Sequence, residues 1–147
     1  MEITVVERTS VPGGLSDLVR RAGLAALESE GEEGDASVVL LGDDEMASWN
    51  ARWLKRQGPT DVIAFAAREG ERAGEAAGDE LGDVLVSVER AAAQAAEYGC
   101  SLDEELARLV IHGMLHLLGW DDAEEGERRK MAERTELILA GVIGGKS

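Results

Sequence analysis

Residues 112–122 read HGMLHLLGWDD and contain both histidines of the chain, His112 and His116. Their spacing of four residues in an apolar stretch places both imidazoles on one face of a helix, one turn apart. Gly119 predicts the end of that helix. The segment 120–122, Trp-Asp-Asp, then turns the chain back beneath the histidines. This stretch therefore predicts a helix whose end brings two imidazoles and a carboxylate together.

Two imidazoles and one carboxylate are suitable ligands for Zn²⁺, and three protein ligands leave a fourth position open for water, as in a catalytic site. The simpler alternative is that both histidines are packed or surface residues without a metal. Zincin peptidases use H-E-x-x-H, in which the Glu is the general base. Here Gly113 follows the first histidine and supplies no base, which disfavours a peptidase. Asp121, Glu124 or Glu125 could serve instead, and the spacing selects none of them.

Outward from this stretch, short apolar runs alternate with segments of helical periodicity. Strands are expected at 2–7, 37–41, 61–66 and 81–88, and helices over 15–27, from 45 to the Gly58-Pro59 pair, over 89–98, from Ser101 to Gly119 and over 123–140. Ser101 and Glu104 form a capping-box pattern at the start of the helix that carries the histidines. These elements predict an α/β (α+β) fold in which a small mixed four-stranded sheet packs with about five helices. Residues 1–147 are expected to form one domain, with a mobile loop at 67–80 and a flexible tail at 142–147.

The composition limits the function. The chain has 147 residues, 44% of them apolar, and its 30 acidic and 15 basic residues give a formal charge of −15. This charge argues against a general nucleic-acid coat protein, and no DNA partner is expected. The single cysteine, Cys100, excludes an internal disulfide framework, so a reducing cytoplasm is expected. We see no signal-peptide pattern and no uncharged stretch long enough to cross a bilayer, and we expect no membrane partner.

The stretch 112–122 resembles the signature of the YbeY family of bacterial endoribonucleases and rRNA maturation factors, H-G-x-L-H-L-x-G-Y-D-H. Asn50 followed by Pro59-Thr60-Asp61-Val62-Ile63-Ala64-Phe65 resembles the family's N…P-T-D-V-L-S-F segment. The strand Leu81-Gly82-Asp83-Val84 resembles its L-G-D-I strand. The resemblance extends over nearly the whole chain in the same order.

This resemblance implies a small α/β sandwich with a four-stranded mixed sheet and a zinc ion held by His112, His116 and Asp122. It also implies hydrolytic cleavage of single-stranded RNA, with roles in maturation of the 16S rRNA 3′ end and in ribosome quality control. The implied partners are the 16S rRNA precursor and the small ribosomal subunit with its associated proteins.

Three positions depart from the family pattern. The third ligand is usually His and is Asp122 here, which still suits Zn²⁺ but makes Mn²⁺ or Fe²⁺ more competitive. An Arg expected four residues after Asn50 is Leu54, and we expect Lys55 and Arg56 to take over its contacts with RNA phosphates. A solvated helix face is the alternative reading of these two cations. The family's strand Ser is Ala64.

Two other functions stay open. Leu54 and Asp122 also suit a ribosome-assembly factor with a structural metal and weak or no nuclease activity. A zinc metallopeptidase is less favoured, and an iron oxygenase ranks last because no residues for a 2-oxo-acid co-substrate are evident. The charge of −15 would repel RNA at long range unless the ribosome or bound Mg²⁺ offsets it.

Overall fold

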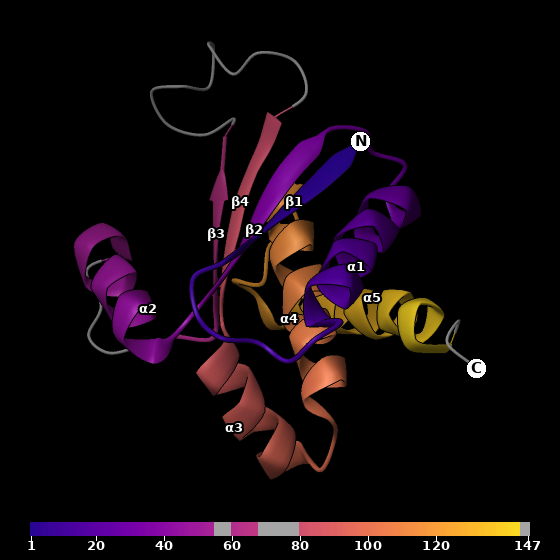
Figure 1. Cartoon of the computed structure of the whole chain (residues 1–147). Coiled ribbons are helices and arrows are strands. Elements are labelled where there is room, and N and C mark those ends of the chain that lie inside the picture. Colours follow the sequence, from indigo (N-terminus) through magenta and orange to yellow (C-terminus); the bar gives the residue numbers. More distant parts are fainter. Residues whose placement is uncertain (55–59, 68–79, 145–147) are drawn as a thin grey trace.

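The computed structural model describes residues 1–54, 60–67 and 80–144. Its centre is a mixed sheet of β1 (Glu2–Glu7), β2 (Asp35–Leu41), β3 (Val62–Ala66) and β4 (Glu80–Ser87), in the order β1-β2-β4-β3 (Figure 1). β1 pairs with β2 and β2 with β4 in parallel, whereas β3 runs antiparallel to β4. The predicted four-stranded mixed sheet in a single domain is therefore confirmed.

The sheet is buried on both faces. In β4, Val84 and Val86 belong to the larger hydrophobic core, and Leu85 belongs to a smaller core that includes Met46. Successive side chains of a strand point to opposite faces, so these two cores lie on opposite sides of the sheet. This explains why β4 is apolar on both faces.

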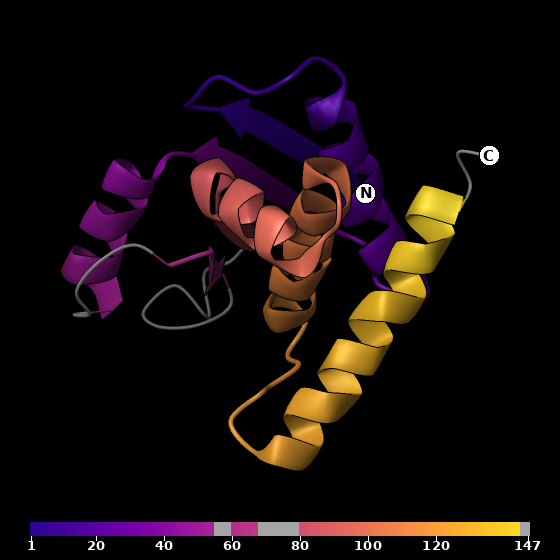
Figure 2. The same ribbon diagram turned by 90° about the horizontal axis from the view of Figure 1, so that it is seen from below.

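Five α-helices in the described residues surround the sheet: α1 (Leu15–Ser29), α2 (Asp43–Trp49), α3 (Val88–Tyr98), α4 (Leu102–Leu117) and α5 (Glu125–Gly144). Figure 1 shows α2 on one side of the sheet and α1, α4 and α5 on the other. α4 contacts β3, β4 and α1, and α5 packs against α4 and α1 from outside, as the view from below shows (Figure 2). α4 is thus the helix that lies between the sheet and α5.

Local sequence signals and close packing both shape α4. The hydroxyl of Ser101 accepts a hydrogen bond from the backbone N–H of Glu104 at 3.1 Å, so the predicted N-terminal cap is present. Halfway along, Gly113 lies so close to the sheet that a Cβ atom there would be 2.5 Å from Cγ1 of Val84. The absence of a side chain at 113 therefore lets the histidine-bearing helix approach β4.

The structure differs from the single helix expected between residue 45 and the Gly58-Pro59 pair. α2 covers Asp43–Trp49 and continues as a π-helix over Asn50–Leu54, while residues 55–59 lie outside the described part. Its first turn is capped from a distance, since the N–H of Asp43 donates to the carboxylate of Glu89 at 2.7 Å. Apolar periodicity does not distinguish a π-turn from an α-turn, because the two differ by one residue in their hydrogen bonding.

The C-terminal helix is longer than predicted. α5 continues to Gly144 instead of ending near Ala140, and Val142 is buried against the larger core. Residues 142–144, expected in a flexible tail, are therefore helical because burial of apolar surface favours the extra turn. Most of the predicted mobile loop, 68–79, and the tail residues 145–147 lie outside the described residues.

No helix in the described part of the chain combines the length and apolar character that crossing a membrane requires.

Candidate metal centre

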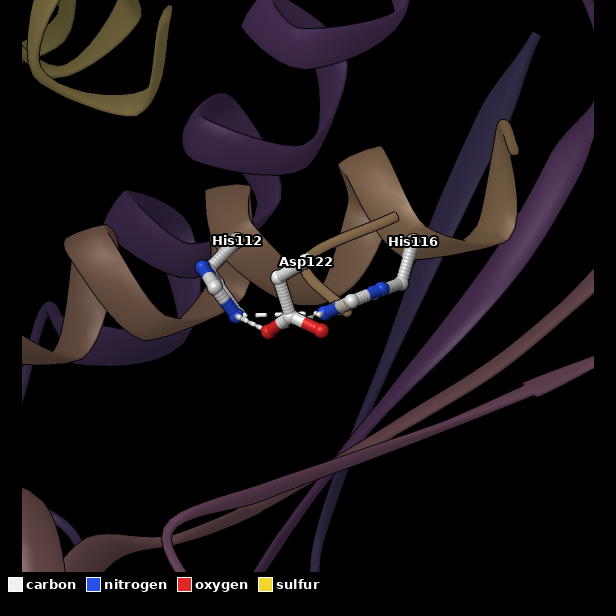
Figure 3. Close-up of side chains that lie close together, drawn as sticks. All are labelled: His112, His116 and Asp122. Atoms are coloured by element: carbon white, nitrogen blue, oxygen red, sulfur yellow. Dashed lines mark hydrogen bonds and ion pairs between the residues drawn. The ribbon is translucent and has the colours of Figure 1, made fainter. Parts of the chain in front are cut away.

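The two histidines and one aspartate converge at the C-terminal end of α4. His112 and His116 project from the same face of this helix, and Asp122 lies in the turn that leads to α5. Figure 3 shows the carboxylate of Asp122 lying between the two imidazole rings. The side chains that the sequence singled out are therefore neighbours in space.

The distances within this cluster suit a small metal ion. Nε2 of His116 lies 3.2 Å from Nε2 of His112. Oδ2 of Asp122 lies 3.5 Å from Nε2 of His116 and 3.9 Å from Nε2 of His112. Ligand atoms about 2.0–2.2 Å from a tetrahedral zinc ion are themselves about 3.3–3.5 Å apart. The donor types and their spacing therefore both fit a three-ligand site.

A hydrogen bond to the turn sets the orientation of His116. Its Nδ1 lies 3.1 Å from the backbone oxygen of Trp120, which can only accept a hydrogen bond. The ring hydrogen is therefore on Nδ1, and Nε2 keeps the lone pair that a metal needs. The turn itself is held by hydrogen bonds from the N–H of Trp120 to Leu115 and from that of Gly119 to His116.

The surroundings of His112 favour its neutral form. Burial of the ring lowers the pKa of His112 most, and the neighbouring His116 lowers it further, whereas Asp122 and Asp61 oppose this. The net shift is downward from the ordinary value. His112 is therefore neutral at pH 7, as metal binding requires.

A cleft of about 490 Å³ opens beside the cluster. Its walls come from β3 and from the turn after α4, and they consist of Val62, Ile63, Ala64, Ala66, His116, Gly119, Trp120 and Asp121. Because His116 lines this cleft, a molecule lying along β3 would reach the cluster directly. The cleft is therefore open to solvent next to the cluster.

The structure describes only some of the other predicted site residues. Lys55 and Arg56, expected to contact RNA phosphates, lie outside the described residues. The carboxylate of Asp121 accepts hydrogen bonds from the N–H groups of Asp122 and Ala123 at 2.7 and 3.1 Å. Asp121 therefore holds the turn, and the aspartate within the cluster is Asp122.

No role near the cluster was expected from the sequence for two residues, Asp61 and Glu30. Asp61 shares a cavity of about 160 Å³ with His112. Glu30, which ends α1, accepts hydrogen bonds from the indole of Trp120 at 2.9 Å and from Arg134 at 2.8 Å. Glu30 and Trp120 are 90 residues apart, and the segment around Glu30 reads as an acidic loop. No local pattern predicts such a contact.

The fold and the cluster together define a class: a small mixed α/β protein with two histidines and a carboxylate, arranged to hold a metal, beside an open cleft. Comparison with known proteins narrows this class. The profile of the family described as endoribonuclease YbeY matches residues 7–142. The chain belongs to the YbeY family, which supports an endoribonuclease role.

Individual relatives agree with this assignment. The endoribonuclease YbeY of Pelotomaculum thermopropionicum is 41% identical over 135 residues, covering 90% of this chain and 89% of the relative. That of Carboxydothermus hydrogenoformans is 38% identical over 142 residues, covering 96% of each chain. The solution structure of a Thermotoga maritima protein has the same fold, with a TM-score of 0.68 at 23% identity, and covers 97% of this chain and 90% of that one.

Proposed function

We propose that the chain is a zinc-dependent endoribonuclease that cleaves single-stranded RNA. The observation that carries this proposal is the convergence of His112, His116 and Asp122 beside a cleft, in a chain of the YbeY family. The two imidazoles and the carboxylate would hold the metal, and Mn²⁺ or Fe²⁺ could replace Zn²⁺ because one ligand is a carboxylate. A metal ion held there supplies a Lewis acid for the phosphate and an activated nucleophile at neutral pH.

The chain's own residues would bind and orient the RNA. The side chains of Val62, Ala64 and Ala66 give the β3 wall of the cleft an apolar surface, against which sugars and bases can lie. The hydrogen bond from His116 to Trp120 keeps Nε2 of that histidine aimed at the cluster. Lys55 and Arg56 follow the π-helix in the sequence and are our candidates for phosphate contacts.

We further propose that the substrate is precursor 16S rRNA, cleaved during maturation of its 3′ end and in ribosome quality control. The partners would be the small ribosomal subunit and its associated proteins, in the cytoplasm. The formal charge of −15 supports a partner of this kind, because an acidic chain alone is repelled by free RNA. Ribosomal proteins and bound Mg²⁺ would supply the missing positive charge.

The same charge favours a second candidate, a ribosome-assembly factor with weak or no nuclease activity and a structural metal. A metallopeptidase is less well supported. The general base of H-E-x-x-H would have to stand at position 113, where even a Cβ atom would be 2.5 Å from Val84.

Metal content and RNA cleavage, measured together on protein purified without a His-tag, test the proposal. We expect about one zinc per chain and cleavage of single-stranded RNA that a chelator abolishes and zinc restores. His116→Ala and Asp122→Ala should lose both metal and cleavage. The control is Glu97→Ala, which removes an exposed carboxylate on α3 and should retain both.

Other outcomes separate the alternatives. A metal-loaded protein that sediments with small ribosomal subunits but leaves RNA intact is the assembly factor. Peptide cleavage without RNA cleavage indicates the peptidase. RNA cleavage at full rate by His116→Ala in the presence of chelator would exclude the mechanism proposed here.

A further inference from the structure

The turn after α4 is anchored to a part of the chain that is remote in sequence. The indole Nε1–H of Trp120 donates to the carboxylate of Glu30 at 2.9 Å. Nε of Arg134, on α5, donates to the other oxygen of the same carboxylate at 2.8 Å. One carboxylate at the end of α1 thus joins the metal-site turn to α5.

This carboxylate is well shielded and charged. The side chain of Glu30 is only 12% exposed, and an Nη of Arg134 also donates to the backbone oxygen of Ser29 at 3.3 Å. Burial alone raises the pKa of Glu30, but hydrogen bonds from Arg134, Trp120 and Ser29 outweigh it and hold the pKa below its usual value. Glu30 is therefore a fixed anion at neutral pH, and charge-assisted hydrogen bonds to it are strong.

Trp120 links this anion to the metal site. Its side chain is held by Glu30, and its backbone oxygen accepts the hydrogen bond from Nδ1 of His116 at 3.1 Å. Holding the indole restricts rotation of the residue whose carbonyl sets the orientation and the tautomer of His116. Glu30, Trp120 and His116 thus form one continuous path from the end of α1 to the cluster.

We propose that Glu30 is a positioning residue for His116, acting through Trp120 to hold the imidazole of that histidine with Nε2 aimed at the metal. The proposal rests on the proposed metal site. Arg134 has a supporting role, since it holds the carboxylate of Glu30 in place. Glu30 and Arg134 act only through Trp120 and are not themselves metal ligands.

The test measures zinc affinity by competition with a chromophoric chelator, for the full chain and three variants. Glu30→Gln keeps the size of the side chain and removes its charge, and Trp120→Phe removes the indole donor. We expect each to weaken zinc binding about tenfold, the lower end of the effect of residues that orient a metal ligand. The double variant should bind zinc no more weakly than Trp120→Phe alone, because both changes break the same path.

The matched control is Glu45→Gln on α2, on the opposite side of the sheet from α4. Glu45 accepts from Nε of Arg8 at 2.6 Å, so this change also breaks a short ion pair between elements. Zinc affinity should be unchanged in this variant. Equal losses in Glu30→Gln and Glu45→Gln would mean that the effect is general destabilisation, and would overturn the proposal.

A second measurement needs no metal. The ¹⁵N shifts of the neutral His116 ring in the metal-free protein report which nitrogen carries the hydrogen. Wild type should show the Nδ1–H tautomer, and Glu30→Gln and Trp120→Phe should show a mixture. If both variants keep the His116 tautomer and the zinc affinity of wild type, the proposal is overturned. If Glu30→Gln does not fold, the same measurements on Trp120→Phe and Arg134→Gln replace it.

These results distinguish failure of the proposed metal site from failure of the proposed role of Glu30. A wild-type protein that binds no zinc contradicts the proposed function, while the tautomer measurement still decides the role of Glu30. If wild type binds zinc and all the variants bind it equally tightly, only the role of Glu30 is contradicted.

Discussion

His112 and His116 occupy different environments although they lie one turn apart. His116 is oriented by the backbone of Trp120, whereas the electrostatic surroundings of His112 are dominated by burial and by the second imidazole. Asp122 opposes both of these effects on His112 through its negative charge. At the scale of single residues, the pKa of His112 therefore reflects burial and the second imidazole on one side, and the carboxylates of Asp122 and Asp61 on the other.

This balance leads to a prediction for the metal-free protein. The pKa of His112, followed by NMR of its ring protons, should lie below its ordinary value of 6.5. Asp122→Asn should lower the pKa further, because it removes a charge that favours the protonated ring. Since the unfolded chain takes up this proton more readily, the metal-free protein should lose stability as the pH falls below about 6.5. A pKa of His112 above the ordinary value would contradict this account.

At the scale of elements, the contact between α4 and β4 depends on Gly113. We expect Gly113→Ala to destabilise the protein by about 1–3 kcal/mol, because the new methyl group meets Val84 in a packed core. The control is Gly141→Ala on the exposed surface of α5, where a Cβ meets nothing within 4 Å. That change should stabilise the protein by about 0.5–1 kcal/mol through helix propensity alone. Denaturant unfolding measures the change in the free energy of unfolding for both variants. A stabilising effect of Gly113→Ala, like that of Gly141→Ala, would refute this role of Gly113.

A second contact between elements joins α4 to α5. Nη1 of Arg108 lies 2.5 Å from the buried carboxylate of Glu105, and its Nε lies 2.6 Å from Glu136. Burial raises the pKa of Glu105, and Arg108 opposes this by stabilising the charged form. Arg108 therefore compensates a carboxylate that α4 keeps away from water.

Removing this cation should be costly at neutral pH. We expect Arg108→Leu to destabilise the protein by about 3 kcal/mol at pH 7, because it leaves the buried Glu105 uncompensated. The loss should shrink toward pH 5, since protonation removes the charge of Glu105. The control Arg90→Leu breaks an exposed pair with Asp43 at 3.5 Å and should cost less than about 1 kcal/mol. Urea unfolding at both pH values measures these effects, and a pH-independent loss would argue against the role of Glu105.

At the scale of the whole molecule, the charge of −15 governs how the chain meets RNA. Like charges repel over distances that salt shortens. We therefore expect kcat/KM for cleavage of a long single-stranded RNA to rise between about 20 and 150 mM KCl, as the repulsion is screened. A dinucleotide substrate, with little charge, should show almost no dependence. A steep fall with salt would instead show that phosphate contacts outweigh the overall charge.

Local sequence patterns predict much of the architecture. Short apolar runs predict the four strands, and the pair Ser101 and Glu104 predicts the start of α4. The spacing of His112 and His116 places both imidazoles on one face, since helix geometry relates residues four apart directly. By contrast, the π-helix at Asn50–Leu54 and the extension of α5 to Gly144 depend on packing that no local pattern records.

The sequence by itself determined the fold class, most of the elements and the placing of His112 and His116 on one helix face, because these follow from short-range spacing; the family resemblance added Asp122 as the third ligand. Only the tertiary structure decided that Gly113 lies against Val84 and that Glu30 anchors Trp120. The physical reason is distance along the chain. Periodicity describes neighbours within a few residues, whereas these contacts arise when burial of the apolar core brings α1, α4, α5 and the sheet together.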